Sequence, residues 1–176
     1  MDLTTVNSLI DKASALQGQA QSALTANNLT QASGYARAAE DALRSADDLI
    51  VASIGTTGLP SAANRPARPT PTTAPTADQQ KARSSNELAH AYQGIVNATN
   101  SVKANSTAAG DLSFYISTAQ GLYKQAYDLY NAGKYDQANR TVHAAEGVAR
   151  IADDLLHAAG VTPAGPQPVP VPAPNF

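Results

Sequence analysis

The strongest constraint on this chain is an internal repeat. Residues 115–159 align without a gap on residues 9–53 when the numbering is shifted by 106 positions. Of the 43 aligned positions that begin at Ile10 and end at Ala52, 17 are identical. A repeated sequence usually forms the same local structure twice, and each unit buries its apolar face against a neighbour. The repeat therefore predicts two similar units that pack on each other.

Each copy has the apolar spacing of two helices joined by a short turn. In the first helix, apolar residues recur every three to four positions, as expected for one helical face, at Leu3, Val6, Leu9 or Ile10, Ala13, Leu16, Ala20 and Ala23 or Leu24. A second stripe, which includes Ala42 or Leu43 and Leu49 or Ile50, follows the turn at Asn27. Asparagine and glycine tolerate the positive φ of tight turns, and Gly133 takes the place of Asn27 in the second copy. Each copy therefore predicts an antiparallel α-hairpin.

Proline marks where helices are interrupted. All eleven prolines lie between residues 60 and 75 or between residues 163 and 174, and proline disrupts helix interiors. We therefore expect a first α-hairpin at 1–54, a Pro/Thr-rich linker at 55–77, and a second α-hairpin at 111–160. The Pro-rich tail at 161–176 is typical of polyproline II.

The remaining stretch, 78–110, predicts an extra helical segment, with Asp78 as its N-cap. Gly110 and Asp111 favour a break before the second hairpin, but the apolar spacing continues in phase through them. One glycine costs a helix only about 1 kcal/mol. We expect a weak point rather than a full reversal, and one kinked helix over 78–131 remains an alternative. Apolar residues such as Leu88 and Ile95 would then be covered either by the bundle itself or by a second molecule, and the second alternative would give a homodimer.

Composition agrees with helices that approach closely. The chain contains two Phe and no Trp, and much of its hydrophobic content is alanine, which favours helix and buries little area. The predicted fold class is all-α: an antiparallel bundle of long Ala-rich helices, built from two duplicated α-hairpins and one extra helical segment.

The turn of the second copy resembles that of a known repeat family. Its spacing of small and aromatic residues, at Ala126, Leu129, Gly133, Tyr135, Ala138, Val142 and Ala145, resembles the tetratricopeptide helix-turn-helix repeat. The resemblance implies a peptide-binding groove.

Three tyrosines form the candidate ligand face. Tyr123, Tyr127 and Tyr130 stand at i, i+4 and i+7, so they share one helical face. Tyrosine combines a large apolar body with one hydroxyl, which suits a ligand pocket. The alternative is that these rings fill space opposite alanine-rich helices.

Catalytic and metal sites are not predicted. Glu87 and His90 have the spacing of di-iron bundles, and His143 and Glu146 have it reversed, but helical rotation places both histidines on polar faces. No nucleophile with a base, and no phosphate loop, can be argued. The pattern Glu, Arg, Asp at i, i+4, i+8 occurs in both copies and predicts a solvated helix face. We expect no catalytic residues, no metal and no cofactor.

The net charge and the sequence motifs limit the classes of function that we expect. A net charge of −2 gives no basic face for nucleic acid, no apolar run is long enough to span a membrane, and the first residues lack the pattern of a signal peptide. Pro-rich segments beside a low-charge bundle favour a non-catalytic helical interaction or scaffold module, extracytoplasmic, with a protein or cell-envelope partner. The alternative is a small-ligand-binding bundle that uses the tyrosine face.

Overall fold

The computed structural model describes residues 3–54, 76–105 and 112–161, and these residues contain helices but no strand. The helices are α1 (Leu3–Thr25), α2 (Leu29–Ile54), α3 (Ala77–Ala104), α4 (Leu112–Asn131) and α5 (Tyr135–Ala158). They pack against one another. The prediction of an all-α bundle is confirmed.

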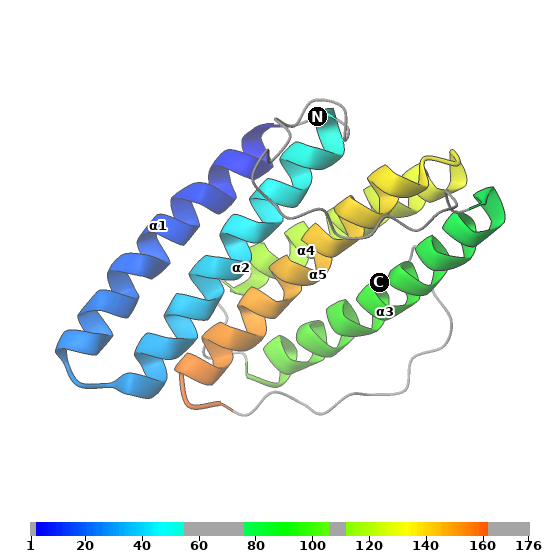
Figure 1. Ribbon diagram of the computed structural model, residues 1–176. Helices are drawn as coiled ribbons and strands as arrows, with labels where there is room; N and C mark the ends of the chain where they lie inside the picture. The colour runs from blue at the N-terminus through cyan, green and yellow to red at the C-terminus, as the bar shows by residue number, and fades with distance from the viewer. Residues whose placement is uncertain (1–2, 55–75, 106–111, 162–176) are drawn as a thin grey trace, which may run out of the picture.

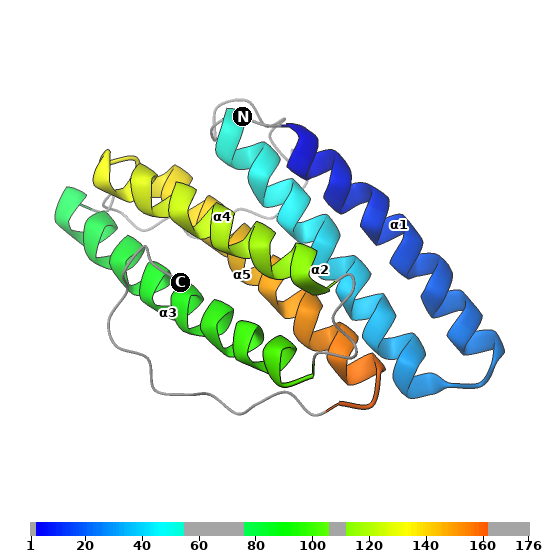
Figure 2. The same cartoon turned by 180° about the vertical axis from the view of Figure 1, so that it is seen from behind.

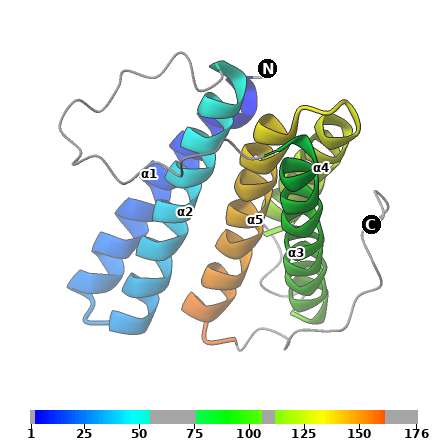
Figure 3. The ribbon, with the colours of Figure 1, turned by 45° about the vertical axis from the view of Figure 1, so that its right-hand side comes forward.

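Helix α5 lies at the centre of the bundle and packs against α2, α4 and α3. Figure 3 shows the hairpin of α1 and α2 on one side of α5, and α3 with α4 on the other. Helix α1 packs on α2 at the outer edge of the molecule (Figure 1). The view from behind shows α4 alongside α3 (Figure 2). The two hairpins therefore meet mainly along α2 and α5.

The two hairpin turns share one pattern of backbone hydrogen bonds. The Asn27 amide donates to the Leu24 carbonyl at 3.0 Å, and 106 positions later the Gly133 amide donates to the Tyr130 carbonyl at 3.0 Å. The next amide in each turn donates to the carbonyl five residues before it, at 2.9 Å. Asn27 and Gly133 have φ of 59° and 74°, so the positive φ expected at both turns is present.

Helices α2 and α5 approach so closely that two positions leave no room for a side chain. A Cβ on Gly34 would lie 2.7 Å from the Cβ of Ala158 and 3.0 Å from the carbonyl oxygen of Asp154. A Cβ on Gly147 would collide with the Oγ of Ser45. Small residues let helix backbones come together and gain dispersion contacts in place of large side chains. This close contact fixes how the hairpins sit on each other.

Helix α3 runs back along α4 instead of continuing into it. The rings of Tyr92 and Tyr123 lie 5.5 Å apart, and the side-chain amide of Gln120 donates to the Thr99 hydroxyl at 3.4 Å. In one continuous helix, Tyr92 and Tyr123 would be separated by ~46 Å. The predicted weak point without reversal, and the alternative of a single kinked helix over 78–131, are therefore wrong.

The start of α3 also differs from the prediction. Thr76 is the N-cap: its hydroxyl accepts from the Gln79 amide at 3.3 Å, and the Gln79 side-chain oxygen accepts from the Thr76 amide at 3.0 Å. This reciprocal pair is a capping box. Asp78, expected as the N-cap, lies in the first turn, where a negative charge is favoured by the helix dipole.

The apolar face of α3 is covered within the chain. Leu88, Ile95 and Val102 are 2%, 0% and 9% exposed and belong to the same core as α4 and α5. Of the two predicted alternatives, cover by the bundle is the one present, because the reversal after α3 places these residues on the second hairpin.

Some predictions lie outside the described residues. The prolines of the linker, the break at Gly110 and Asp111, and nearly all of the Pro-rich tail fall on 55–75, 106–111 and 162–176. Among the helices that the structure describes, none is both long enough and apolar enough to be a membrane span.

Candidate functional site: an uncovered apolar seam

The first hairpin carries apolar side chains that the other described helices leave uncovered. The exposed large hydrophobic residues of the described chain all lie on α1 and α2, and they are Leu3, Ile10, Leu24, Leu29, Leu43, Ile50 and Ile54. Between 37% and 64% of each residue is exposed. We call this set the apolar seam.

Six of the seven seam residues lie at multiples of seven residues along their helix, and Ile54 lies about one turn beyond Ile50. Seven residues make about two helical turns, so residues at this spacing share one face. Since α1 and α2 are antiparallel, residues at equal distances from the turn lie at the same level. The resulting pairs are Leu3 with Ile50, Ile10 with Leu43, and Leu24 with Leu29. Between the last two pairs lies a level formed by Gln17 and Ala36, both exposed.

The seam faces away from the second hairpin. Ser45 marks the side of α2 that meets α5, and Leu43, two residues earlier, lies about 200° around the helix from it. Lys12 marks the side of α1 that approaches α4, because its Nζ lies 4.7 Å from the ring centroid of Phe114. Ile10 lies about 200° from Lys12 by the same rotation.

The same positions of the second hairpin are buried. The counterparts of Ile10, Leu43 and Ile50, taken 106 positions later, are Ile116, Ala149 and Leu156. These counterparts are 8%, 2% and 0% exposed. Helix α3 packs on both α4 and α5 and closes this face, whereas no described helix closes the seam.

Sequence reasoning did not identify the seam. The periodicity left one of two adjacent residues open at four stripe positions, and the structure buries the first of each pair, namely Leu9, Ala23, Ala42 and Leu49. Leu3, which the periodicity placed in the buried stripe, is exposed. The buried stripe of α1 consists of Val6, Leu9, Ala13, Leu16 and Ala23. The signal for a second face was the seven-residue spacing of leucine and isoleucine beside that stripe.

The predicted ligand face belongs to the covered side of the second hairpin. Tyr123 is 0% exposed, and its ring packs on Tyr92 of α3 at 5.5 Å. Tyr127 and Tyr130 are partly buried against the core, and the Tyr130 ring lies 5.6 Å from that of Tyr135. Burial raises the pKa of Tyr123 well above its usual value. Helix α3 thus occupies the space in front of these tyrosines.

Two hollows lie between the hairpins, with volumes of about 310 and 300 Å³. Their linings are related by the repeat: Leu16, Gln19 and Leu155 in the first correspond to Leu122, Gln125 and Leu49 in the second. The hairpins therefore leave a similar gap at each end of their contact.

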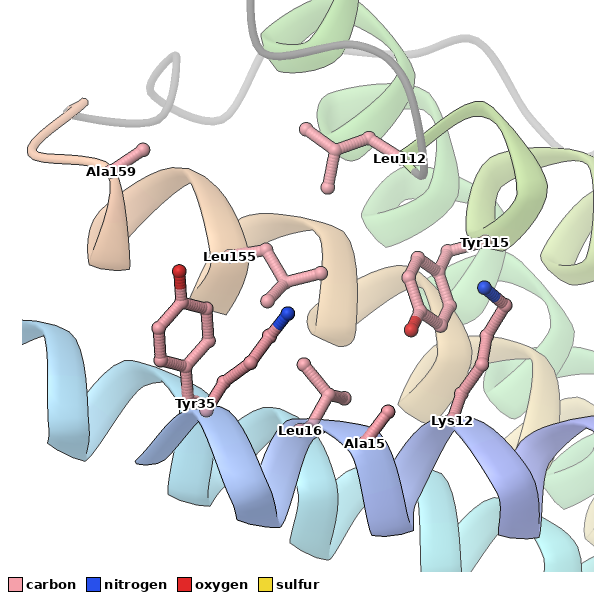
Figure 4. A pocket seen from close by; sticks show the side chains of 9 residues that line it. Lys12, Ala15, Leu16, Tyr35, Leu112, Tyr115, Leu155 and Ala159 are labelled. Atoms are coloured by element: carbon pink, nitrogen blue, oxygen red, sulfur yellow. The ribbon is translucent and has the colours of Figure 1, made fainter. Parts of the chain in front are cut away.

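The first hollow combines one ammonium group with apolar walls. Lys12 of α1 and Tyr115 of α4 lie next to each other at one end, and Tyr35 of α2 and Leu155 of α5 lie toward the other (Figure 4). The Lys12 Nζ lies 5.4 Å from the Tyr115 ring centroid, within the range of a cation–π contact. The hollow is at the small end of ligand-site volumes.

The residues with di-iron spacing are not gathered at one point. His90 is largely exposed, and its Nδ1 lies 3.7 Å from the Glu146 carboxylate on α5. Glu87 pairs with Arg83 at 3.9 Å, while His143 borders a separate surface hollow. The described residues contain no cluster of three or more metal-ligating His, Asp or Glu side chains.

The repeated charge pattern has different partners in the two copies. Arg44 pairs with Glu40 on α2 at 2.6 Å, with both side chains exposed. Its counterpart Arg150 lies 3.6 Å from Asp41 and so links α5 to α2. Burial raises the pKa of Asp41 although Arg150 opposes this. The repeat could not reveal this link, because the counterpart of Asp41 is Gly147.

The Asp153 carboxyl group of the second hairpin is partly buried. Burial raises the pKa of Asp153 to about 6, and the neighbouring Asp154 adds to the shift. Asp153 follows Glu146 by two turns on the side of α5 where α3 packs. Its counterpart Asp47 is exposed.

The sequence matches no protein-family model, and neither the curated proteins nor the solved structures include a significant match. The first hairpin spans Leu3–Ile54, which is longer than the ~34-residue tetratricopeptide unit. The resemblance to that family is therefore confined to the turns.

Proposed function

We propose that this chain is a non-catalytic helical interaction module and that the apolar seam is its docking surface. The observation that supports the proposal is the unequal cover of the two hairpins. Repeat-related faces are sealed by α3 in the second hairpin and left exposed at Ile10, Leu43 and Ile50 in the first. Monomers rarely expose contiguous apolar patches of this kind unless they bind something there.

The seam has the form of a surface that accepts helices. Its apolar side chains repeat along two adjacent antiparallel helices. On the second hairpin the equivalent face is covered by an amphipathic helix, α3, through residues such as Leu88 and Ile95. Helix-in-groove packing of this type uses anchors at helical spacing.

Site-specific photo-crosslinking in the producing cells tests the proposal. A photoreactive residue at Leu43 should give defined adducts, while the same residue at Ala89, on the exposed side of α3, should give none. Leu43 is half exposed, so the substitution leaves the fold intact. Adducts at neither position, or equal adducts at both, would contradict the proposal.

The Pro-rich segments beside the bundle support an extracytoplasmic location, which we include in the proposal. Cell fractionation with protease protection checks it. Recovery of the chain only from the cytosol would reject this part alone.

Ligand binding is the second candidate, and the observation that favours it is the hollow beside Lys12 rather than the tyrosine face. A ligand at Tyr123 would have to displace Tyr92 of α3. The Lys12 hollow would suit a small organic carboxylate with an apolar body. Benzoate at millimolar concentration should then raise the melting temperature of the wild type but not of Lys12→Met.

A further inference from the structure

We propose that the apolar seam binds the seam of a second copy of this chain, so that two chains form a symmetric homodimer through their first hairpins. The inference rests on the proposed function, which makes the seam a docking surface, and it adds the occupant. In a symmetric dimer one patch serves on both chains, so that patch must be complementary to itself.

The area of the seam suits a dimer. Its seven side chains are 37–64% exposed. They leave roughly 700 Å² of apolar surface per copy, close to the ~800 Å² that each partner contributes to a standard interface. The described residues offer no second set of exposed large hydrophobic side chains, because α3 covers the equivalent face of the second hairpin. Self-association would therefore join seam to seam.

The order in which large apolar side chains and Ala36 occur along the seam favours an antiparallel arrangement of the two copies. When two seams meet with their helices antiparallel, α1 lies over α1 and α2 over α2. Leu43 of each copy then lies over Ala36 of the other, and Leu3 lies over Leu24. A parallel arrangement would instead place the level of Gln17 and Ala36, which has no large apolar side chain, over itself. Large-against-small packing fills space best.

The rims of the seam permit close approach. On α1 the nearest exposed residues beside it, Asn7, Ser14 and Gln21, are uncharged, and the exposed Asp11 lies about 100° around the helix from Ile10. On α2, Asp47 and Glu40 are both exposed beside Leu43, and Glu40 lies near the middle of the seam. Its ion pair with Arg44 at 2.6 Å offsets the repulsion between the two Glu40 side chains that an antiparallel dimer would bring together.

Sedimentation velocity of the full chain at ~100 µM tests the proposal, because interfaces of this size bind with micromolar or tighter affinity. The wild type should sediment as a dimer. Leu43→Glu and the milder Ala36→Glu should sediment as monomers, and the control Ala89→Glu on exposed α3 should remain a dimer. Circular dichroism should show equal helix content in all four proteins.

Cross-linking tests the orientation. The chain contains no cysteine, so each introduced thiol is unique. In the antiparallel dimer, position 7 of one chain lies beside position 21 of the other, while two copies of the same position are ~20 Å apart. A short thiol cross-linker should join Asn7→Cys to Gln21→Cys chains in a mixture, and neither variant to itself.

The outcomes separate the two proposals. A wild type that stays monomeric, or a Leu43→Glu variant that stays dimeric, overturns the homodimer. If the monomeric wild type still gives adducts with another protein at Leu43, the interaction module stands with a different occupant. Cross-linking of each cysteine variant to itself alone would overturn the antiparallel dimer.

Discussion

The two hairpins share a repeat and a turn geometry but differ in what covers their outer faces. Ile10 and Leu43 are 43% and 52% exposed, while their counterparts Ile116 and Ala149 are 8% and 2% exposed. The difference is due to α3, which has no equivalent on the first hairpin among the described helices. The same pattern of residues therefore forms a core in one place and a surface in the other.

The comparison of the two hairpins also shows which features depend on residues close in sequence and which depend on tertiary contacts. The turns agree hydrogen bond for hydrogen bond because they depend on residues close in sequence. Burial depends on neighbours that arrive from elsewhere in the chain. A repeat therefore predicts the shape of each hairpin better than it predicts its surroundings.

The largest expected effect is the difference in lost stability between alanine substitutions at two repeat-related positions, Leu156 and Ile50. Leu156→Ala should lower the free energy of unfolding by about 2–5 kcal/mol, because it leaves a cavity in the core. Ile50→Ala, whose side chain is partly exposed, should lower it by only about 1 kcal/mol. Urea unfolding at low protein concentration, where the chain is monomeric, measures both. Equal losses would show that the two faces are covered alike.

The next effect concerns the contact between the hairpins. Gly34→Ala should destabilise the protein by about 1–3 kcal/mol, because the new methyl meets Ala158 and the backbone of α5. Gly121→Ala is the control: apart from the adjoining backbone of its own helix, nothing lies within 4 Å of its Cβ position, so higher helix propensity should stabilise it by about 0.5–1 kcal/mol. Chemical denaturation measures both variants, and changes of the same sign would contradict the close packing.

A smaller effect should depend on pH. Because burial raises the pKa of Asp153 to about 6, the native state holds this proton more tightly than the unfolded chain. The resulting stabilisation is complete below pH ~4 and is lost as pH rises through about 6. Asp153→Asn should therefore be more stable than the wild type at pH 7.5, by about 1 kcal/mol after solvent screening, and equal to it at pH 3.5.

Thermal unfolding across this pH range measures the difference. Asp47→Asn, at the exposed counterpart, is the control and should change stability by less than ~0.5 kcal/mol. A constant difference between Asp153→Asn and the wild type at all pH values would contradict burial of the carboxyl group.

The smallest expected effect is the coupling energy between the glutamate and the arginine that occur in both copies of the repeat. Glu40 and Arg44 are exposed, so a double-mutant cycle should give a coupling of about 0.3–0.5 kcal/mol that falls in salt. The same cycle on Glu146 and Arg150 should give less, because Arg150 lies at Asp41. A coupling above ~1 kcal/mol in either cycle would contradict this.

Much of the fold could be predicted from the sequence. Helical spacing and the turns at Asn27 and Gly133 gave both hairpins. The reversal after α3 could not be predicted, because the apolar spacing runs in phase across it. The candidate site was missed for a related reason: Leu9 and Ile10 are adjacent, and periodicity alone cannot say which of them faces the core.

The sequence by itself determined the helices, their turns and the likeness of the two hairpins, because these depend on propensity and on contacts a few residues apart. Only the tertiary structure decided that α3 lies on the second hairpin and that no described helix covers the seam of the first. Burial is a property of three-dimensional neighbours, and side chains as alike as Ile50 and Leu156 acquire different roles when only one of them lies in the interior of the bundle.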